Sequence, residues 1–178
     1  MSESTVALRY AKSLIDLAEE KNVVETVYKD MVLFKTVSDD NRGLMLALKS
    51  PVVRHDKKLA ILKGVFQDKV DPVSFGIFNI ITHKNREGIM HSIAEAFIKL
   101  YDERKGIVKA YITSSTALTD ALRKQFMTIV AEATGKTVEL EEKVDDKLIG
   151  GYILRVGDRQ VDASIRKQLN DLKLKLLN

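Results

Sequence analysis

The sequence predicts a mainly α fold, with a six-helix N-terminal bundle and a small α+β C-terminal domain that holds a β-hairpin sheet and two helices. Two observations support this. Up to Lys105 the apolar residues recur at steps of three and four, as on one face of an α-helix. After Gly106 they begin to alternate with polar residues, as in a half-buried strand. The predicted boundary between domains 1–105 and 106–178 therefore lies at Lys105-Gly106.

The first two helices follow from their apolar stripes and their ends. From Thr5 to Glu20 the apolar residues share one helical face, and Ser4 or Thr5 can supply the N-cap. A second helix is predicted from Val23 to Val37. It is expected to end there because the turn-forming run Ser38-Asp39-Asp40-Asn41 follows.

Four further helices complete the predicted bundle. Asp71-Pro72 is a strong helix start, because Asp can cap a helix and Pro is tolerated at its first position. Lys84-Asn85-Arg86 is expected to be the break before the last helix. The four predicted ranges are Arg42–Lys49, Asp56–Phe66, Pro72–His83 and Glu87–Arg104.

The C-terminal domain mixes strand and helix patterns. Helical spacing returns from Thr119 to Thr134, with Gly135 placed to cap the helix in the left-handed conformation. A last helix is predicted to start at Ser164. The strands are predicted around Val108, Ala110 and Ile112, around Val138, Leu140 and Val144, from Leu148 to Val156, and from Gln160 to Ala163.

The composition excludes several classes of protein. The 178 residues contain no cysteine, so thiol catalysis, disulfides and thiolate metal sites are ruled out. The net charge of +4 arises from interspersed basic and acidic residues, which is typical of solvated helix faces and not of a nucleic-acid-binding stripe. No apolar run is long enough to span a membrane, and the N-terminus lacks the apolar core of a secretory signal. The chain is expected to stay in the cytoplasm.

Two short motifs suggest enzyme chemistry but lack its other parts. Gly135-Lys136-Thr137 resembles the end of a phosphate-binding loop, yet Val130 stands where the first glycine is required, and the motif follows a helix where a strand is needed. Ser164 and Lys167 match the Ser-x-x-Lys pattern of penicillin-recognising enzymes, but the companion motifs are missing. A C-cap at Gly135 and an N-cap at Ser164 are the simpler interpretations.

Histidines and carboxylates do not form a catalytic or metal-binding pattern either. His55, His83 and His91 fall in different segments without metal-ligand spacing. The acidic run around Glu139 and Glu141 alternates with apolar residues, which indicates the polar side of a half-exposed strand. The sequence thus predicts neither a cofactor nor a metal site.

The stretch LIGGYILRVGDRQVDASI, from Leu148 to Ile165, is the most distinctive part of the chain. No helix is predicted after Gly150-Gly151, so the pair cannot be a phosphate cradle of the usual kind. A glycine pair in a strand more often marks a bulge or the close approach of another backbone. Gly157-Asp158 is expected to form a tight turn, and Asp162 to help cap the last helix.

This region carries a specific family resemblance. The run VELEEKVDDKLIGGYILRVG, with its continuation DRQVDASIRKQL, resembles the signature of the delta subunit of the rotary F-type ATP synthase, the counterpart of the mitochondrial oligomycin-sensitivity-conferring protein. At the front, RYAKSLIDLAEEKN is similar to the family's opening helix, and Asn85-Arg86 stands at its break before the sixth helix. The signature positions are Val138, Leu140, Val144, Asp145, Leu148, Gly150, Gly151, Leu154, Arg155 and Gly157.

The resemblance implies a stator subunit without catalysis or cofactor. The N-terminal domain would sit on the catalytic alpha/beta head and receive the N-terminal helix of an alpha subunit in a groove between its first and fifth helices. The C-terminal domain would meet the C-terminal end of the peripheral-stalk b subunits. Such a subunit keeps the head from rotating with the rotor during proton-coupled ATP synthesis. It would be peripheral on the cytoplasmic side of the cell membrane, with no membrane insertion and no nucleic-acid partner.

A subunit that holds the head against the rotor must bind the head tightly. A nanomolar complex corresponds to a binding free energy of about 12 kcal/mol. Apolar anchors at helical spacing can supply it in helix-in-groove docking. Since the sequence does not distinguish the groove face of a helix from its core face, a core role for Leu14 and Ile77 is an equal alternative. The Leu- and Lys-rich last helix is the candidate for the stalk contact. The groove candidates are Tyr10, Ser13, Leu14, Ile77, Ile80 and Lys84.

Two other hypotheses remain at this point. The chain could be a general helical adaptor that binds a different amphipathic peptide. It could also be a small enzyme whose site has no known motif. Binding of a peptide from the alpha-subunit N-terminus distinguishes the adaptor from the stator, and an intrinsic ATPase activity of the isolated chain would contradict the stator hypothesis.

Overall fold

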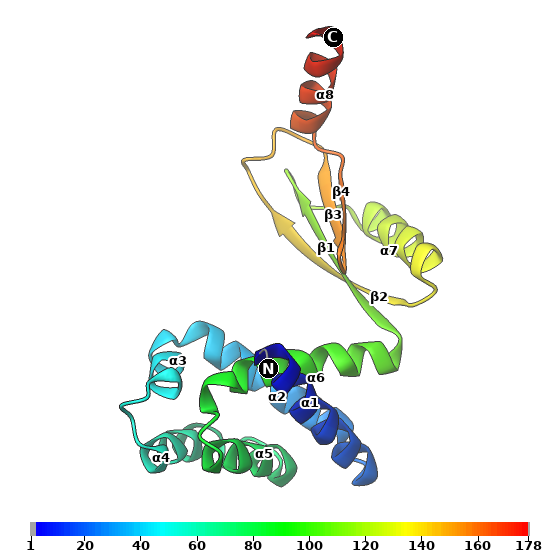
Figure 1. The fold of residues 1–178 in the computed structure, drawn as a ribbon. Coiled ribbons are helices and arrows are strands. Elements are labelled where there is room, and N and C mark those ends of the chain that lie inside the picture. Colours follow the sequence, from blue (N-terminus) through cyan, green and yellow to red (C-terminus); the bar gives the residue numbers. More distant parts are fainter. Residues whose placement is uncertain (1–2, 178) are drawn as a thin grey trace. The chain divides into compact units, whose positions relative to one another are not determined.

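The computed structural model describes residues 3–177 and divides the chain into two compact units, Met1–Asp102 and Glu103–Asn178 (Figure 1). The division falls inside the sixth helix, which continues to Lys105. The first unit is all helical and the second mixes helices with one sheet, as the sequence predicts.

The N-terminal unit consists of six α-helices and one short 3-10 turn among its described residues. Asp71 starts α5 as expected: its carboxylate accepts a hydrogen bond from Val73 N at 2.8 Å, and Pro72 occupies the first helical position. The elements are α1 (Glu3–Glu20), α2 (Val24–Asp40), α3 (Arg42–Lys49), α4 (His55–Phe66), α5 (Pro72–His83), η1 (Glu87–Ile89) and α6 (Met90–Lys105).

Aromatic and aliphatic side chains from all six helices fill one core in this unit. Phe34 and Phe66 pack with ring centroids 5.2 Å apart, and Phe78 lies 4.9 Å from Phe34. One buried carboxylate links two helices in this core. Asp30 of α2 accepts hydrogen bonds from the backbone N–H of Asp71 and the hydroxyl of Ser74, at the start of α5. These contacts hold the start of α5 against α2.

Three predictions about helix ends in this unit are wrong. α1 already includes Glu3, so Ser4 and Thr5 lie inside this helix and neither is its N-cap. The helix predicted to end at Val37 continues to Asp40, because Ser38 lies buried and Asn41 N still donates to Val37 O at 3.0 Å. Residues with turn propensity thus remain helical where packing favours it. The helix predicted from Glu87 begins only at Met90, since Glu87–Ile89 form the tighter 3-10 turn.

The C-terminal unit contains two helices and four strands among its described residues. Thr119 caps α7, and Gly135 ends it in the left-handed conformation at φ 66°, which confirms the predicted C-cap. The elements are β1 (Ile107–Ser114), α7 (Asp120–Thr134), β2 (Thr137–Val144), β3 (Tyr152–Val156), β4 (Arg159–Asp162) and α8 (Ile165–Leu177).

The four strands form one mixed sheet in the order β2-β1-β3-β4. β1 and β2 run parallel and are joined through α7, whereas β1 with β3 and β3 with β4 are antiparallel. The β3–β4 pair is the predicted hairpin. α7 covers one face of the sheet, where Phe126 and Val130 pack against Ala110, Ile112 and Leu154 (Figure 1).

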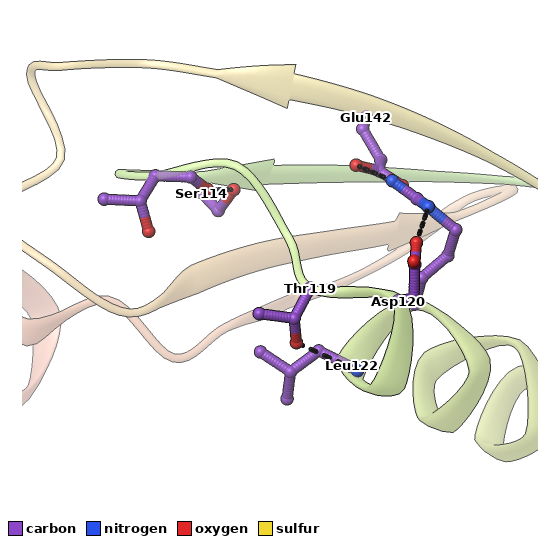
Figure 2. A network of polar contacts seen from close by, with 7 residues as sticks. Ser114, Thr119, Asp120, Leu122 and Glu142 are labelled. Carbon is purple, nitrogen blue, oxygen red and sulfur yellow. Dashed lines mark hydrogen bonds and ion pairs between the residues drawn. The ribbon is translucent and has the colours of Figure 1, made fainter.

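A polar cluster attaches the first turn of α7 to β2. The guanidinium of Arg123 donates to Asp120 Oδ1 at 2.6 Å and to both carboxylate oxygens of Glu142, so that it lies between the two acids (Figure 2). Its hydrogen bonds hold the pKa of the Glu142 carboxyl below its ordinary value. Glu142 therefore stays ionised and fixes the helix start over the sheet.

The strand predicted from Leu148 to Val156 begins only at Tyr152. Residues 145–151 form turns instead, in which Leu148 N donates to Asp145 O at 3.0 Å. The physical reason is the backbone of Gly151, whose φ of +82° does not occur in a strand. The last helix starts at Ile165, one residue after its cap Ser164.

Candidate functional site

The six groove candidates lie on α1 and on α5 with its C-cap, and they divide into two groups by exposure. Leu14 and Ile77 are 2% and 9% exposed and belong to the same core cluster. Ile80, in contrast, is 51% exposed, and Ser13 and Lys84 also lie at the surface. Only the second group can touch a partner without rearrangement of the unit.

Tyr10 lies between these groups. Its side chain is half-buried against the core, and its hydroxyl accepts a hydrogen bond from Arg86 Nη1 at 3.2 Å. This bond joins α1 to the break after α5. The hydroxyl of Ser13 donates to Arg9 O one turn earlier, so it is already used within its own helix. The structure thus connects the two candidate helices through Tyr10 and through a shared core.

Three of the apolar signature residues contribute to the core of the C-terminal unit. Val138 on β2 and Leu154 on β3 are buried, and they flank the central strand β1 on opposite sides. Leu140 packs partly against the same core, whereas Val144 at the end of β2 is exposed. Asp145 then accepts from Lys147 N through its carboxylate and starts the turn that carries Leu148.

Two of the three signature glycines, Gly150 and Gly151, occupy positions where a side chain would collide. Gly151 has φ +82°, and a Cβ there would stand 2.3 Å from the carbonyl oxygen of Ala163. Beside it, Gly150 O accepts from Ile165 N at 3.0 Å. The predicted close approach of another backbone is therefore confirmed, although it occurs before the strand and not as a bulge within it. The approaching backbone is the segment that leads into α8.

Two side chains cap the start of α8. The carboxylate of Asp162 accepts from Ser164 N at 2.9 Å, and hydrogen bonds from Ser164 hold the pKa of Asp162 below its ordinary value. Ser164 Oγ in turn accepts from Lys167 N at 3.3 Å. The Ser-x-x-Lys match is thus an N-cap with its N3 position, as the simpler interpretation has it.

α8 carries an apolar stripe that its own unit leaves largely exposed. The four residues of this stripe follow one another at spacings of four, three and four, so they share one face of the helix. Their exposed fractions lie between 40% and 78%. We call this set the α8 stripe; it consists of Ile165, Leu169, Leu172 and Leu176.

The sequence did not reveal one buried ionic pair. Lys58 Nζ lies 3.5 Å from Glu87 Oε2, and both side chains are more than nine-tenths buried. The burial of Lys58 could have been predicted, because it precedes the core residues Leu62 and Phe66 at steps of four on α4 and so shares their face of the helix. Glu87 could not be found in this way because it lies in the 3-10 turn.

The described residues, 3–177, contain no cluster of three metal-ligating side chains of the His, Cys, Asp or Glu type that could hold an ion. In that same range no helix is both long and apolar enough to cross a bilayer.

Comparisons with known proteins give a consistent result. The model of the family "ATP synthase delta (OSCP) subunit" matches residues 6–176. The chain is 40% identical over 175 residues to the ATP synthase subunit delta of Cytophaga hutchinsonii, covering 98% of this chain and 96% of that one. It is 35% identical to the same subunit of Flavobacterium johnsoniae over the full length of both chains.

A solved structure has the same fold. A chain of the mitochondrial ATP synthase hexamer of Toxoplasma gondii superposes with a TM-score of 0.72, at 22% identity and 97% coverage of both chains. The family match over nearly the whole length includes both units and all the signature positions. The chain therefore belongs to the ATP synthase delta (OSCP) family and is a non-catalytic stator component of the peripheral stalk of an F-type ATP synthase.

Proposed function

We propose that this chain joins the catalytic alpha/beta head to the peripheral-stalk b subunits, and that each of its two units holds one of these partners. The N-terminal unit receives the N-terminal helix of an alpha subunit beside α1 and α5. The C-terminal unit binds the C-terminal end of the b subunits through α8. The complex lies at the cytoplasmic side of the cell membrane, with this chain as a peripheral part.

The observation that carries this proposal is the exposed α8 stripe. Four large aliphatic side chains at helical spacing expose an apolar face that a single chain in water would normally bury. The start of the helix is fixed by the Ser164 cap and by the bond from Ile165 N to Gly150 O. The stripe is thus presented on an anchored helix, which suits a helical partner.

The N-terminal contact rests on Tyr10, Ser13, Ile80 and Lys84, the four groove candidates that are not buried. Ile80 provides an apolar anchor, and Lys84 offers a cation at the C-terminal end of α5. Leu14 and Ile77 lie beneath as core residues that hold the two helices in position. An amphipathic helix with an apolar face and an acidic edge would complement this surface.

The test uses membranes stripped of their own delta subunit and measures proton-coupled ATP synthesis after addition of the full chain. The intact chain should restore synthesis. Leu172→Asp should abolish restoration because it places a charge in the α8 stripe, yet it should leave binding of an alpha-subunit N-terminal peptide unchanged. Ile80→Asp should abolish binding of the alpha-subunit peptide, because it places a charge at the apolar anchor of the N-terminal contact.

Matched controls are available on both units. Leu174 is exposed on the face of α8 opposite the stripe, so Leu174→Asp should restore synthesis like the intact chain. Val52 is exposed in the connection between α3 and α4, and Val52→Asp should bind the alpha peptide normally. If the intact chain binds no alpha peptide at micromolar concentration, the head contact is wrong. Equal effects of Leu172→Asp and Leu174→Asp would contradict the stalk contact.

A further inference from the structure

α8 is a helix that its own unit does not cover. Every side chain from Ile165 to Leu176 is exposed. Figure 1 shows the helix extending from the end of the sheet without packing on it. An isolated helix of 13 residues is marginal in water, because most helical stability in proteins comes from packing of the apolar face. The pattern of residues on α8 therefore describes the partner that it packs against.

The α8 stripe has the spacing of a coiled-coil seam. Its members recur at steps of four, three and four, which is the alternation of the d and a positions of a heptad repeat. Ile165 and Leu172 take the d positions, and Leu169 and Leu176 take the a positions. A helix that packs on a globular core usually has a wider apolar face, of about three residues in seven. This narrow seam suits one facing helix better than a broad surface.

The residues on both edges of the seam are cationic or neutral. In this register Arg166 and Lys173 occupy the e positions on one edge. Gln168 and Lys175 occupy the g positions on the other. Asp171, the one acid of α8, stands at a c position outside both edges. Residues at e and g face those of the partner helix and so select the partner by charge. α8 therefore favours a helix with carboxylates at these positions.

A second copy of this chain does not meet the requirement. In an antiparallel pair of α8 helices, Arg166 and Lys173 of one copy would face the same cations of the other. In a parallel pair Lys173 would face Gln168. Neither orientation gives an ion pair, and the first repels.

An anionic lipid surface is the other chemistry that a helix rich in Leu and Lys attracts. Helices that lie on membranes carry Trp and Phe beside Leu on their apolar face. α8 contains no aromatic residue, and its apolar face is the narrow a and d seam. These two features favour a protein helix over a lipid surface.

We propose, on the basis of the stalk contact above, that α8 pairs with a single α-helix as a short two-stranded coiled coil, and that this partner helix carries carboxylates at its e and g positions. The seam supplies the apolar contact, and the edges choose the partner. The Ser164 cap and the bond from Ile165 N to Gly150 O hold the first turn of α8 in helical form. Pairing therefore does not have to nucleate this helix, which offsets its small length.

The experiment measures binding of two synthetic peptides to the full chain by backbone amide NMR. Both peptides have about three heptads with Leu at every a and d position. One carries Glu and the other Lys at every e and g position, so each repels itself and stays available. The Glu peptide should give saturable shifts at α8 and bind at least about tenfold more tightly than the Lys peptide at low salt, as expected for two or three exposed ion pairs. Salt of about 0.5 M should narrow this difference by screening.

Charge reversal tests the edges without a change in the seam. The double variant Lys173→Glu/Lys175→Glu should reverse the preference, so that the Lys peptide binds more tightly than the Glu peptide. A variant that merely fails to fold cannot produce this reversal. Lys167→Glu makes the same change at the f position, away from both edges, and should keep the preference for the Glu peptide. Leu172→Asp should abolish binding of both peptides.

Three results would overturn the proposal. Two of them are equal affinity for the Glu and Lys peptides at low salt, and no binding of either peptide up to about 1 mM. The third is competition between the Glu peptide and vesicles of phosphatidylcholine with phosphatidylglycerol, if Leu172→Asp abolishes it, because α8 would then be a membrane-surface helix.

These outcomes are distinguishable from failure of the stalk contact itself. If Leu172→Asp prevents restoration of ATP synthesis while the peptides show no charge preference, the contact with the b subunits stands and only the chemistry of its edges is wrong. If Leu172→Asp restores synthesis like the intact chain, the stalk contact is wrong.

Discussion

Replacing Gly151 with alanine should destabilise the C-terminal unit by about 2–5 kcal/mol. Two features of the structure contribute to this loss of stability. The first part is the backbone conformation: at φ +82° a residue with a Cβ costs about 1–2 kcal/mol. The second part is the collision. The new Cβ would stand 2.3 Å from Ala163 O, and relieving such overpacking costs about 1–3 kcal/mol.

Native-state hydrogen exchange of the β1 and β3 amides measures this loss in the C-terminal unit, while the amides of α2 and α5 report on the other unit as an internal reference. Gly157→Ala is the matched control. Gly157 has φ +58°, but a Cβ there would meet no atom within 4 Å, so the substitution should cost only the conformational part, about 1–2 kcal/mol.

The difference between the two variants isolates the close approach of the Ala163 backbone. If Gly151→Ala costs no more than Gly157→Ala, the backbone of Ala163 yields freely, and the reasoning that the signature glycines fix the start of α8 is wrong. If the reasoning holds, Gly151→Ala should also weaken restoration of ATP synthesis at temperatures where the unit is still folded, because the displaced Ala163 and Ser164 lead directly into the α8 stripe.

Three further predictions concern the N-terminal unit and can be checked by urea denaturation. Leu14→Ala should lower the free energy of unfolding by about 2–5 kcal/mol and Ile80→Ala by less than about 0.5 kcal/mol, since only Leu14 is buried; equal losses would contradict this division. Asp30→Ala removes the acceptor of two hydrogen bonds and should cost about 2–5 kcal/mol, whereas Asp30→Asn, which keeps one acceptor oxygen, should cost about half; an equal cost for both would argue against the hydrogen bonds as the cause. Burial, together with the hydrogen bond to Glu25, raises the pKa of Tyr101 from 10.0 to about 12. The unfolded state therefore loses this proton first, so the stability that this group contributes is fully present below pH 10 and is lost as the pH rises through 12. Tyr101→Phe should remove this slope, and a slope that persists would assign it to another group.

Most element ends could be predicted where a local signal dominates. Gly135 and Asp71-Pro72 act through their own backbone preferences, so the ends of α7 and α5 were found from the sequence. The run from Ser38 to Asp40 has equally strong turn propensity but stays helical because Ser38 is buried by the fold. Tertiary burial outweighs a local preference of this kind, and no sequence pattern shows where that burial will occur.

The candidate partner surfaces show the same limit. The helical periodicity of α1 and α5 identifies their apolar residues but treats Leu14 and Ile80 alike. Only the packed structure separates them, since Leu14 contributes to the core and Ile80 does not. The pairing of Lys58 with Glu87 was also out of reach, because the two residues are far apart in the sequence and meet only when α4 packs against η1.

The sequence by itself determined the family, the order of helices and strands, and the non-catalytic role, because these depend on local periodicity and on a long signature read along the chain. Only the tertiary structure decided what the signature does. It showed that the backbone which approaches Gly151 is that of Ala163, and that the α8 stripe is left exposed. The physical reason is that exposure and close approach are properties of pairs of segments, which a single segment of sequence does not contain.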